Sequence, residues 1–387
     1  MKLKNILYIG LALFVCTGCS KDEDHGNEPK GKALLSVKVS ANGTAASGAV
    51  MKGYTPDKNN ELPGEANVNN LTVLVFNENG TAMLADPHWS DTRPANGSVT
   101  ITDIEVSPAK AQIVFVANTE NGTFDGIGTY TDFENKLAQL AGQRQDNLTM
   151  SSRVISTEKA LVAGDNYLGY SSMGDGNING IASPIEITRL PARLDLANVR
   201  TDFTKTILMG RSVTVESIYV KNQKTASRFF SPGYWGTVMT DGNLSNSTVT
   251  PLGIVANNTT SLAETPYIHY VMENKTETVG ATLAAPTQFV IRATLAASGE
   301  YQAETQTFVA TINENGMLKE YDHNYIKRNY VYRITITFRD KNFEGDRIDP
   351  PVDPPIDPVD PPETEEAQLD VQVQVIGWGP VNQDVEI

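Results

Sequence analysis

Short runs of alternating apolar and polar residues, separated by clusters of Gly, Asn, Asp and Pro, recur along most of this chain. They limit its possible folds more than any other feature. In the first run, residues 33–39, the side chains of Leu35, Val37 and Val39 share one face. A period of two is typical of β-strands that bury one face. Many such strands in succession predict an all-β sandwich architecture.

Further strands are expected in the same pattern, at 71–76, 98–106, 112–117, 184–199 (two strands), 212–222, 267–273, 287–295, 305–312 and 330–338. Arg189 and Arg193 are expected to project from the pair of strands at 184–199. About 370 residues remain after the N-terminal leader described below, which suggests two domains of ordinary size. We place the boundary between them near residue 200.

One helix is predicted near residues 131–143. Phe133, Leu137 and Leu140 recur there at helical spacing, and Thr131 or Asp132 can cap the first turn. We expect this helix to pack on the sandwich.

Residues 1–18 have the composition of a signal peptide. A short basic region precedes an apolar run at 6–15, which is too short to span a bilayer as a helix. The run ends in Cys16-Thr17-Gly18-Cys19, which resembles the lipobox of bacterial lipoproteins, where the peptide is cut before the cysteine and the thiol is acylated. This pattern predicts a lipid on Cys19. The alternative is an ordinary secretory signal with a chance cysteine.

Cys16 and Cys19 are the only cysteines in the chain. Cys19 therefore stands alone after cleavage, and no disulfide can form within the mature chain. An acidic run, residues 20–24, follows it and resembles the surface-export signal of Bacteroidia lipoproteins. The alternative is that this run is only a solvated spacer.

The charge and the scarcity of reactive side chains exclude several classes of function. Loss of Lys2 and Lys4 with the leader moves the formal charge from −15 to −17, which makes nucleic acid an improbable partner. The four histidines are scattered, and none pairs with another at metal-ligand spacing. No nucleophile elbow or phosphate-binding loop is present. We expect neither catalytic residues nor a metal or cofactor.

A long polar stretch, residues 40–70, follows the first strand. Connections of this length are uncommon inside compact domains unless they are functional or flexible, and exposed loops are favoured sites of proteolysis. Lys52, followed by Gly53, and Lys58 are the basic residues within it.

The C-terminal end joins a stiff spacer to one more strand. Proline at the density of residues 349–362 favours an extended chain, which spans roughly 40 Å. The strand that follows carries a strict apolar face formed by Leu369, Val371, Val373 and Val375. The spacer predicts that this strand is held away from its own domain and completes a sheet of another subunit. The alternative is that it folds back on its own domain, and periodicity alone does not decide between them.

The chain as a whole resembles the FimA-type fimbrillins, the subunits of the type V pili of Bacteroidia. The resemblance is carried by the lipobox, the first strand, and the stretches 71–77, 115–119, 166–177, 189–193, 328–334 and 367–378 in this order. It implies two tandem transthyretin-like β-sandwich domains.

The resemblance also implies a maturation route. The precursor is an outer-membrane lipoprotein, a trypsin-like protease cuts it on the cell surface, and the first strand leaves with Leu35, Val37 and Val39. The groove accepts the C-terminal strand of the next subunit, which places Leu369, Val371, Val373, Val375 and Trp378 in a head-to-tail homopolymer that also contains tip and anchor subunits. That segment assigns the chain to the stalk. Lys52 stands where a cleavage arginine is expected, so the cut is predicted before Gly53, with Lys58 as the second choice.

These expectations divide the chain into a leader (1–18), a lipidated propeptide (19–52), two sandwiches (53–199 and 200–348), a spacer (349–366) and a donor strand (367–387). The alternative function is that of a surface glycan-binding lipoprotein. It needs exposed aromatic platforms, for which Trp89, Tyr234 and Trp235 are the candidates. We expect these three side chains to serve in packing instead.

Overall fold

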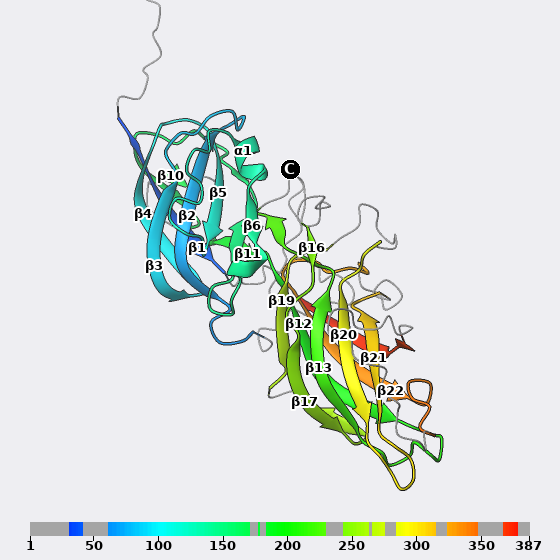
Figure 1. The fold of residues 1–387 in the computed structure, drawn as a ribbon. Helices are drawn as coiled ribbons and strands as arrows, with labels where there is room; N and C mark the ends of the chain where they lie inside the picture. The colour runs from blue at the N-terminus through cyan, green and yellow to red at the C-terminus, as the bar shows by residue number, and fades with distance from the viewer. Residues whose placement is uncertain are drawn as a thin grey trace, which may run out of the picture.

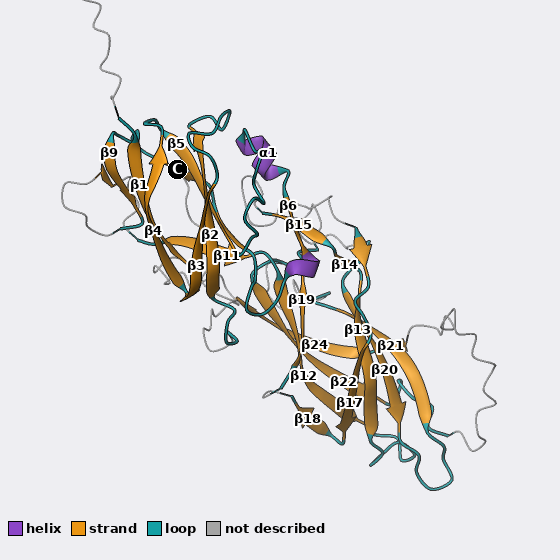
Figure 2. Cartoon of the chain, turned by 60° about the vertical axis from the view of Figure 1, so that its left-hand side comes forward, coloured by secondary structure: helices purple, strands orange, loops and turns teal. Residues whose placement is uncertain are grey.

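The computed structural model describes residues 31–41, 61–170, 177–178, 183–229, 243–262, 265–274, 284–314, 323–346 and 367–377. They form two lobes built almost entirely from strands (Figures 1 and 2), which confirms the all-β prediction. None of the described helices has the length and apolar character needed to cross a membrane. Cys19, Lys52, Gly53, Lys58 and the proline-rich spacer lie outside the described residues.

The N-terminal lobe holds a ten-stranded sheet whose main path runs β10-β9-β1-β11-β7-β5-β2-β3, with β4 beside β1 and β8 beside β5. The sheet encloses one apolar core, because inward-facing residues of β1 and β4 meet those of β2 and β5. Its strands are β1 (Ala33–Ser40), β2 (Asn67–Asn77), β3 (His88–Asn96), β4 (Ser98–Val106), β5 (Ala111–Ala117), β7 (Met150–Ser152), β8 (Ile155–Ser156), β9 (Gly164–Leu168), β10 (Asn177–Ile178) and β11 (Ile185–Arg189).

The C-terminal lobe is a sandwich of two five-stranded sheets around a second core. One sheet runs β18-β12-β22-β24, with β19 beside β12, and the other runs β17-β13-β20-β21-β23. The strands are β12 (Ala192–Asp202), β13 (Val213–Lys221), β17 (Thr250–Ala256), β18 (Thr259–Ser261), β19 (Tyr267–Val271), β20 (Gln288–Leu295), β21 (Glu304–Thr311), β22 (Tyr330–Arg339), β23 (Ala367–Gln368) and β24 (Asp370–Gly377). Two short strands, β14 (Gln223–Lys224) and β16 (Leu244–Ser245), pair with each other nearby.

The change from one lobe to the other falls earlier than residue 200, which lies inside β12. The Leu190 N–H still donates to Thr149 O in the N-terminal lobe. The carbonyl of Pro191 accepts from Asn329 N in the C-terminal lobe. The predicted boundary is therefore about ten residues too late, because a strand pattern that continues through 199 does not reveal which sheet the strand joins.

The predicted helix is reduced to α1 (Tyr130–Glu134), which is capped by Thr129 rather than by Thr131 or Asp132. Thr129 and Asp132 form a reciprocal capping box. Beyond the helix, β6 (Leu137–Gln139) pairs with β15 (Ala226–Arg228) of the other lobe, and a short 3₁₀ turn follows. The strand pairing between lobes thus replaces the last helical turns.

The C-terminal strand does not stand away from its own domain. β24 pairs antiparallel with β22 from Thr337↔Asp370 to Tyr330↔Gly377, and Leu369 is 8 % exposed within the core of the C-terminal lobe. The expectation of a detached strand is wrong in this conformation, and the fold-back alternative is the one observed. Trp378 lies outside the described residues.

Candidate assembly strands and the lobe junction

Strand β1 is bonded along both of its edges. On one side β4 runs antiparallel to it over its whole length. On the other side, β9 pairs with its first half and β11 with its last two residues, both in parallel. Its apolar face, formed by Ala33, Leu35, Val37 and Val39, is at most 1 % exposed. The strand predicted to be removable is thus an interior strand of the N-terminal lobe.

Loss of β1 would leave a groove with free backbone groups on both walls and an apolar floor. Unpaired backbone groups in such a place cost free energy, so the groove favours a replacement strand. The replacement needs an alternating apolar face and similar length. β1 and β24 both have eight residues, and both alternate apolar with polar residues.

Gly169 follows β9 and limits what the groove can hold. Its φ is +86°, and a Cβ at this position would lie 2.4 Å from the carbonyl oxygen of Lys38 in β1. Only glycine allows this close approach of the two backbones without displacement. A larger residue would obstruct any strand that takes the same path as β1.

Strand β24, in contrast, is bonded on one edge only. It ends the strand order of its sheet, and among the described strands only β22 is hydrogen-bonded to it. Figure 1 places β1 in one lobe and β24, drawn in red, in the other. The candidate acceptor and the candidate donor therefore lie in different lobes.

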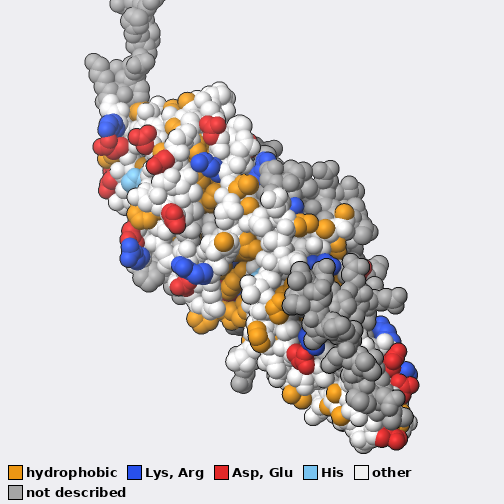
Figure 3. Space-filling view, in the orientation of Figure 1, with side chains coloured by type: hydrophobic (Ala, Val, Ile, Leu, Met, Phe, Trp, Pro, Cys, Tyr) orange, Lys and Arg blue, Asp and Glu red, His pale blue; other side chains and the backbone are white. Residues whose placement is uncertain are grey.

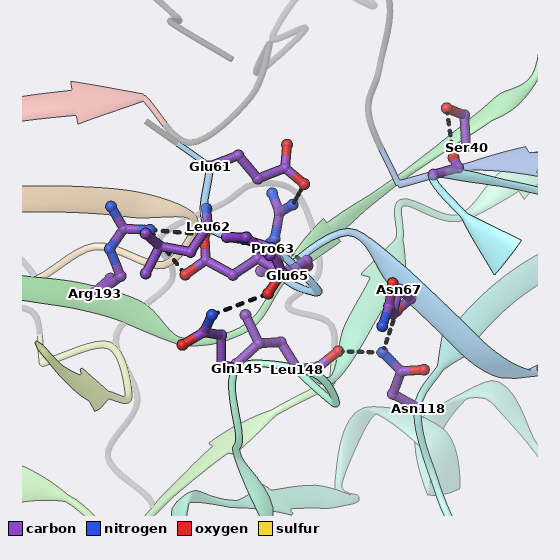
Figure 4. Close-up of polar contacts among 12 residues, drawn as sticks. Ser40, Glu61, Leu62, Pro63, Glu65, Asn67, Asn118, Gln145, Leu148 and Arg193 are labelled. Carbon is purple, nitrogen blue, oxygen red and sulfur yellow. Dashed lines mark hydrogen bonds and ion pairs between the residues drawn. The ribbon is translucent and has the colours of Figure 1, made fainter. Parts of the chain in front are cut away.

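The chain that follows the predicted cleavage region is anchored in a buried ion cluster between the lobes (Figure 4). Arg193 Nη1 lies 2.8 and 2.7 Å from the two carboxylate oxygens of Glu65. Its Nε and Nη2 lie 2.8 and 2.9 Å from the carboxylate of Asp195. Tyr270 Oη donates to Glu65 Oε1 at 2.7 Å. Burial, together with the charge of Glu65, raises the pKa of Tyr270, so it remains a donor.

Arg189 extends the same cluster. Its Nε donates to Glu65 O at 2.8 Å, and its Nη2 donates to Glu61 Oε1 at 2.9 Å. Burial lowers the pKa of Arg189, and the two glutamates oppose that shift. Both Arg189 and Arg193 have side chains 1 % exposed, so they project from their strands into the junction between the lobes and not into solvent. The two arginines were noticed in the sequence, and Asp195 is close to Arg193 in the chain, but the carboxylates of Glu61 and Glu65 are each 128 positions away from the arginine that they contact.

Apolar and hydrogen-bonded contacts complete the junction. Phe124 and Phe133 of the N-terminal lobe pack against Phe229, with ring centroids 5.0 and 6.4 Å from it. Ser151 donates to the carbonyl of Phe229. Arg328 Nε lies 2.7 Å from Glu273, and its Nη2 donates to Ser227 Oγ at 2.9 Å. The two lobes are therefore joined by buried ion pairs, aromatic packing and hydrogen bonds.

Among the described residues, no group of three His, Cys, Asp or Glu side chains is placed to hold a metal ion. The three described histidines lie on separate elements with different partners. They are bonded to Ser90 (His88), Gln223 (His269) and Tyr332 (His323).

Two family models together match nearly the whole chain. Residues 33–189 match the major fimbrial subunit protein FimA, and residues 190–378 match the C-terminal domain of the fimbrium tip subunits like Fim1C. The border between the two matches coincides with the structural change of lobe at Leu190 and Pro191.

Similar proteins and solved structures have the names of fimbrial subunits or cell-adhesion proteins. A Parabacteroides distasonis protein named "Putative fimbrium tip subunit Fim1C" is 42% identical over 383 residues, covering 98% of both chains. The major fimbrium subunit FimA type-2 of Porphyromonas gingivalis is 24% identical over 407 residues, covering 99% of both chains. A solved structure of a "putative cell adhesion protein" from P. distasonis has 41% identity and a TM-score of 0.76, covering 91% of this chain and 99% of that one. A P. gingivalis fimbrilin at 17% identity, with a TM-score of 0.57, shares the fold.

Proposed function

This chain belongs to the fimbrillins, the family of fimbrial subunits, and we propose that it enters a surface fimbria by exchange of β-strands between subunits. One observation carries the proposal. Strand β1 lies inside the N-terminal lobe and is hydrogen-bonded along both edges. Strand β24 has the same length, lies in the C-terminal lobe, and is hydrogen-bonded to only one of the described strands.

The difference in pairing supplies a driving force for exchange. A β24 strand that moves from its own sheet edge into the groove of a neighbour gains a second row of backbone hydrogen bonds. Each such bond contributes about 1 kcal/mol. The buried β22 edge that it leaves behind must be paired or covered in the filament. Docking of β24 on its own chain thus competes with assembly and keeps the free subunit soluble.

Maturation makes the groove available. We propose that the chain is exported as an outer-membrane lipoprotein acylated at Cys19, and that a trypsin-like protease cuts after Lys52 or Lys58. Either cut lies upstream of Glu61, so the ion cluster holds the new chain start in place. Only the residues before the cut, which include β1, are then free to leave.

We place this subunit near the fimbrial tip rather than along the stalk, joined to its neighbours by the same strand exchange. The stalk assignment depended on the presence of the C-terminal donor segment, which in this fold is docked on β22 of its own lobe. The relative that is 42% identical carries a tip-subunit name, whereas the FimA relative is 24% identical. Immunogold labelling of this chain should mark fimbrial ends. Labelling along the whole fimbria would restore the stalk assignment.

Strand exchange is tested with a synthetic peptide of residues 367–378 and the full chain before and after trypsin-type cleavage. We expect the peptide to bind the cleaved chain after β1 is displaced, and not the uncleaved chain. A Val373→Asp peptide is the matched control and should not bind, because it places an unpaired charge in an apolar groove. Gly169→Ala in the cleaved chain should also prevent binding. Equal binding to cleaved and uncleaved chain would contradict strand exchange.

A further inference from the structure

A polar hollow opens in the N-terminal lobe beside the edge strand β3, away from the assembly strands. Its volume is about 310 Å³, within the range of ligand pockets of roughly 300–1,000 Å³. The lining contains one aromatic side chain and no aliphatic one. Its residues are Asn69, Asn70, Trp89, Asp91, Arg93, Arg144, Asp146 and Asn147.

The indole of Trp89, which lines one wall of the hollow, is held by a hydrogen bond to a residue outside the lining. The half-buried Trp89 donates its indole N–H to Thr119 O at 3.2 Å. The N–H of Thr119 in turn donates to Asn70 Oδ1 at 2.9 Å. The indole therefore keeps one orientation whether or not a ligand is present, which reduces the entropy cost of binding.

A second wall of the hollow, formed by the turn at residues 144–147, is also held by hydrogen bonds. The side-chain amide of Asn69 donates to Asp146 O at 2.8 Å and to Asn147 Oδ1 at 2.9 Å. Gln145, in the same turn, donates to Pro63 O at 2.9 Å. The turn that forms this wall is thus tied both to β2 and to the segment before it.

The charges in the hollow balance. Asp91 accepts from Arg93 through both carboxylate oxygens, at 2.9 and 2.7 Å. Arg144 lies 3.8 Å from Asp146. The hydrogen bond from Arg93 lowers the pKa of Asp91, so this carboxyl stays ionised. On the face seen in Figure 3, acidic and basic side chains lie beside one another at several places, while acidic side chains gather on the upper part of the N-terminal lobe. Such a hollow attracts neither anions nor cations strongly.

We infer that this hollow binds a neutral saccharide. Carboxylate, amide and guanidinium groups offer paired acceptors and donors that suit adjacent sugar hydroxyls, and a fixed indole offers a flat apolar surface to the C–H face of a pyranose ring. A peptide ligand is usually anchored by apolar side chains in a pocket, and the lining of this hollow has no aliphatic side chain to receive them. The other aromatic candidates, Tyr234 and Trp235, lie outside the described residues.

This inference goes beyond assembly, because it gives the subunit a contact with glycans that does not depend on polymerisation. It is tested on the uncleaved monomer, so its failure and the failure of strand exchange are distinguishable. Trp235→Phe and Trp378→Phe leave Trp89 as the single tryptophan of the chain. Its fluorescence is followed during titration with methyl glycosides of galactose, mannose, fucose and N-acetylglucosamine.

We expect a saturable fluorescence change with at least one glycoside and about tenfold weaker binding in Asp91→Ala. Asp86→Ala, which removes an exposed carboxylate outside the hollow, is the matched control and should bind normally. Ligand-detected NMR extends the test to Trp89→Ala, which should lose binding, and Trp89→Phe, which should retain part of it. No response to any glycoside, an equal response in Asp91→Ala, or binding only of phosphate or a short peptide would each overturn the inference.

Discussion

Charged residues form much of the junction between the two lobes, and the sequence did not reveal their contacts. Arg, Glu and Asp are almost never fully buried unless they are paired. Arg193 and Glu65 are 128 positions apart, so no local pattern connects them. The alternation that identified the apolar faces of the strands assigns these residues to the outside. Only the folded arrangement shows that they meet.

Loss of Arg193 should destabilise the protein strongly. Arg193→Ala leaves Glu65 and Asp195 as buried carboxylates without their common partner, which costs about 3–5 kcal/mol. Arg200→Ala, at an exposed position on the same strand, should change the stability little. Urea unfolding of both variants measures the difference. A variant lacking Arg193 that is as stable as the wild type would show that the cluster does not hold the junction.

His269 should make stability depend on pH. Burial lowers its pKa from 6.5 to about 4. Between these values the unfolded chain takes up a proton that the folded chain does not, so this contribution is complete above pH 6.5 and is lost as the pH falls toward 4. The loss is on the order of 3 kcal/mol at most. His269→Gln should show a smaller fall in the free energy of unfolding between pH 7 and pH 4.5 than the wild type. An equal fall in both would contradict this.

At the scale of elements, periodicity located most of the long strands, missed β3 and β17, and did not identify which strands pair. The strands expected at 98–106, 112–117 and 330–338 are present with ends shifted by at most one residue. β24 was also found as a strand, but its position on β22 was not. A period of two shows that one face is buried, and it does not show against which sheet. The helix was overextended for a related reason, since pairing with β15 across the lobes outweighs the local pattern after Glu134.

An acidic residue in β24 should separate folding from assembly. Val373 is in register with Ile334, which is fully buried. Val373→Asp should prevent β24 from joining a neighbouring subunit and lower the melting temperature by several degrees, because about 1 kcal/mol corresponds to roughly 2–4 °C in a domain of this size. The monomer should remain folded, because β24 is the outermost strand of its sheet. Gln372→Glu is the control and should assemble normally. Unboiled gels and thermal melts are the measurements, and ladders formed by Val373→Asp would exclude β24 as a donor.

At the scale of the whole molecule, the proposed acceptor groove at β1 and the proposed donor strand β24 lie in different lobes, and a buried junction joins the two lobes (Figures 1 and 2). Strand exchange between such subunits adds each one in the same orientation, which gives an open filament rather than a closed ring when the rotation does not close. We expect the ion cluster at Arg189 and Arg193 to stiffen such a filament as well as to stabilise the subunit. The fold class and the strand pattern behind this organisation were predictable from sequence, whereas the junction was not.

Processing should leave the junction intact and remove β1. N-terminal sequencing of sheared fimbriae should give a start at Gly53, or at Asn59 if the protease cuts after Lys58. Both starts precede Glu61, so the contact between Glu61 and Arg189 survives either cut. Cys19→Ala should abolish labelling with fatty acid and stop maturation, because the precursor is no longer anchored where the protease acts. Fimbriae that still contain residues 33–39 would show that the groove is never opened, and assembly would then require a contact other than strand exchange.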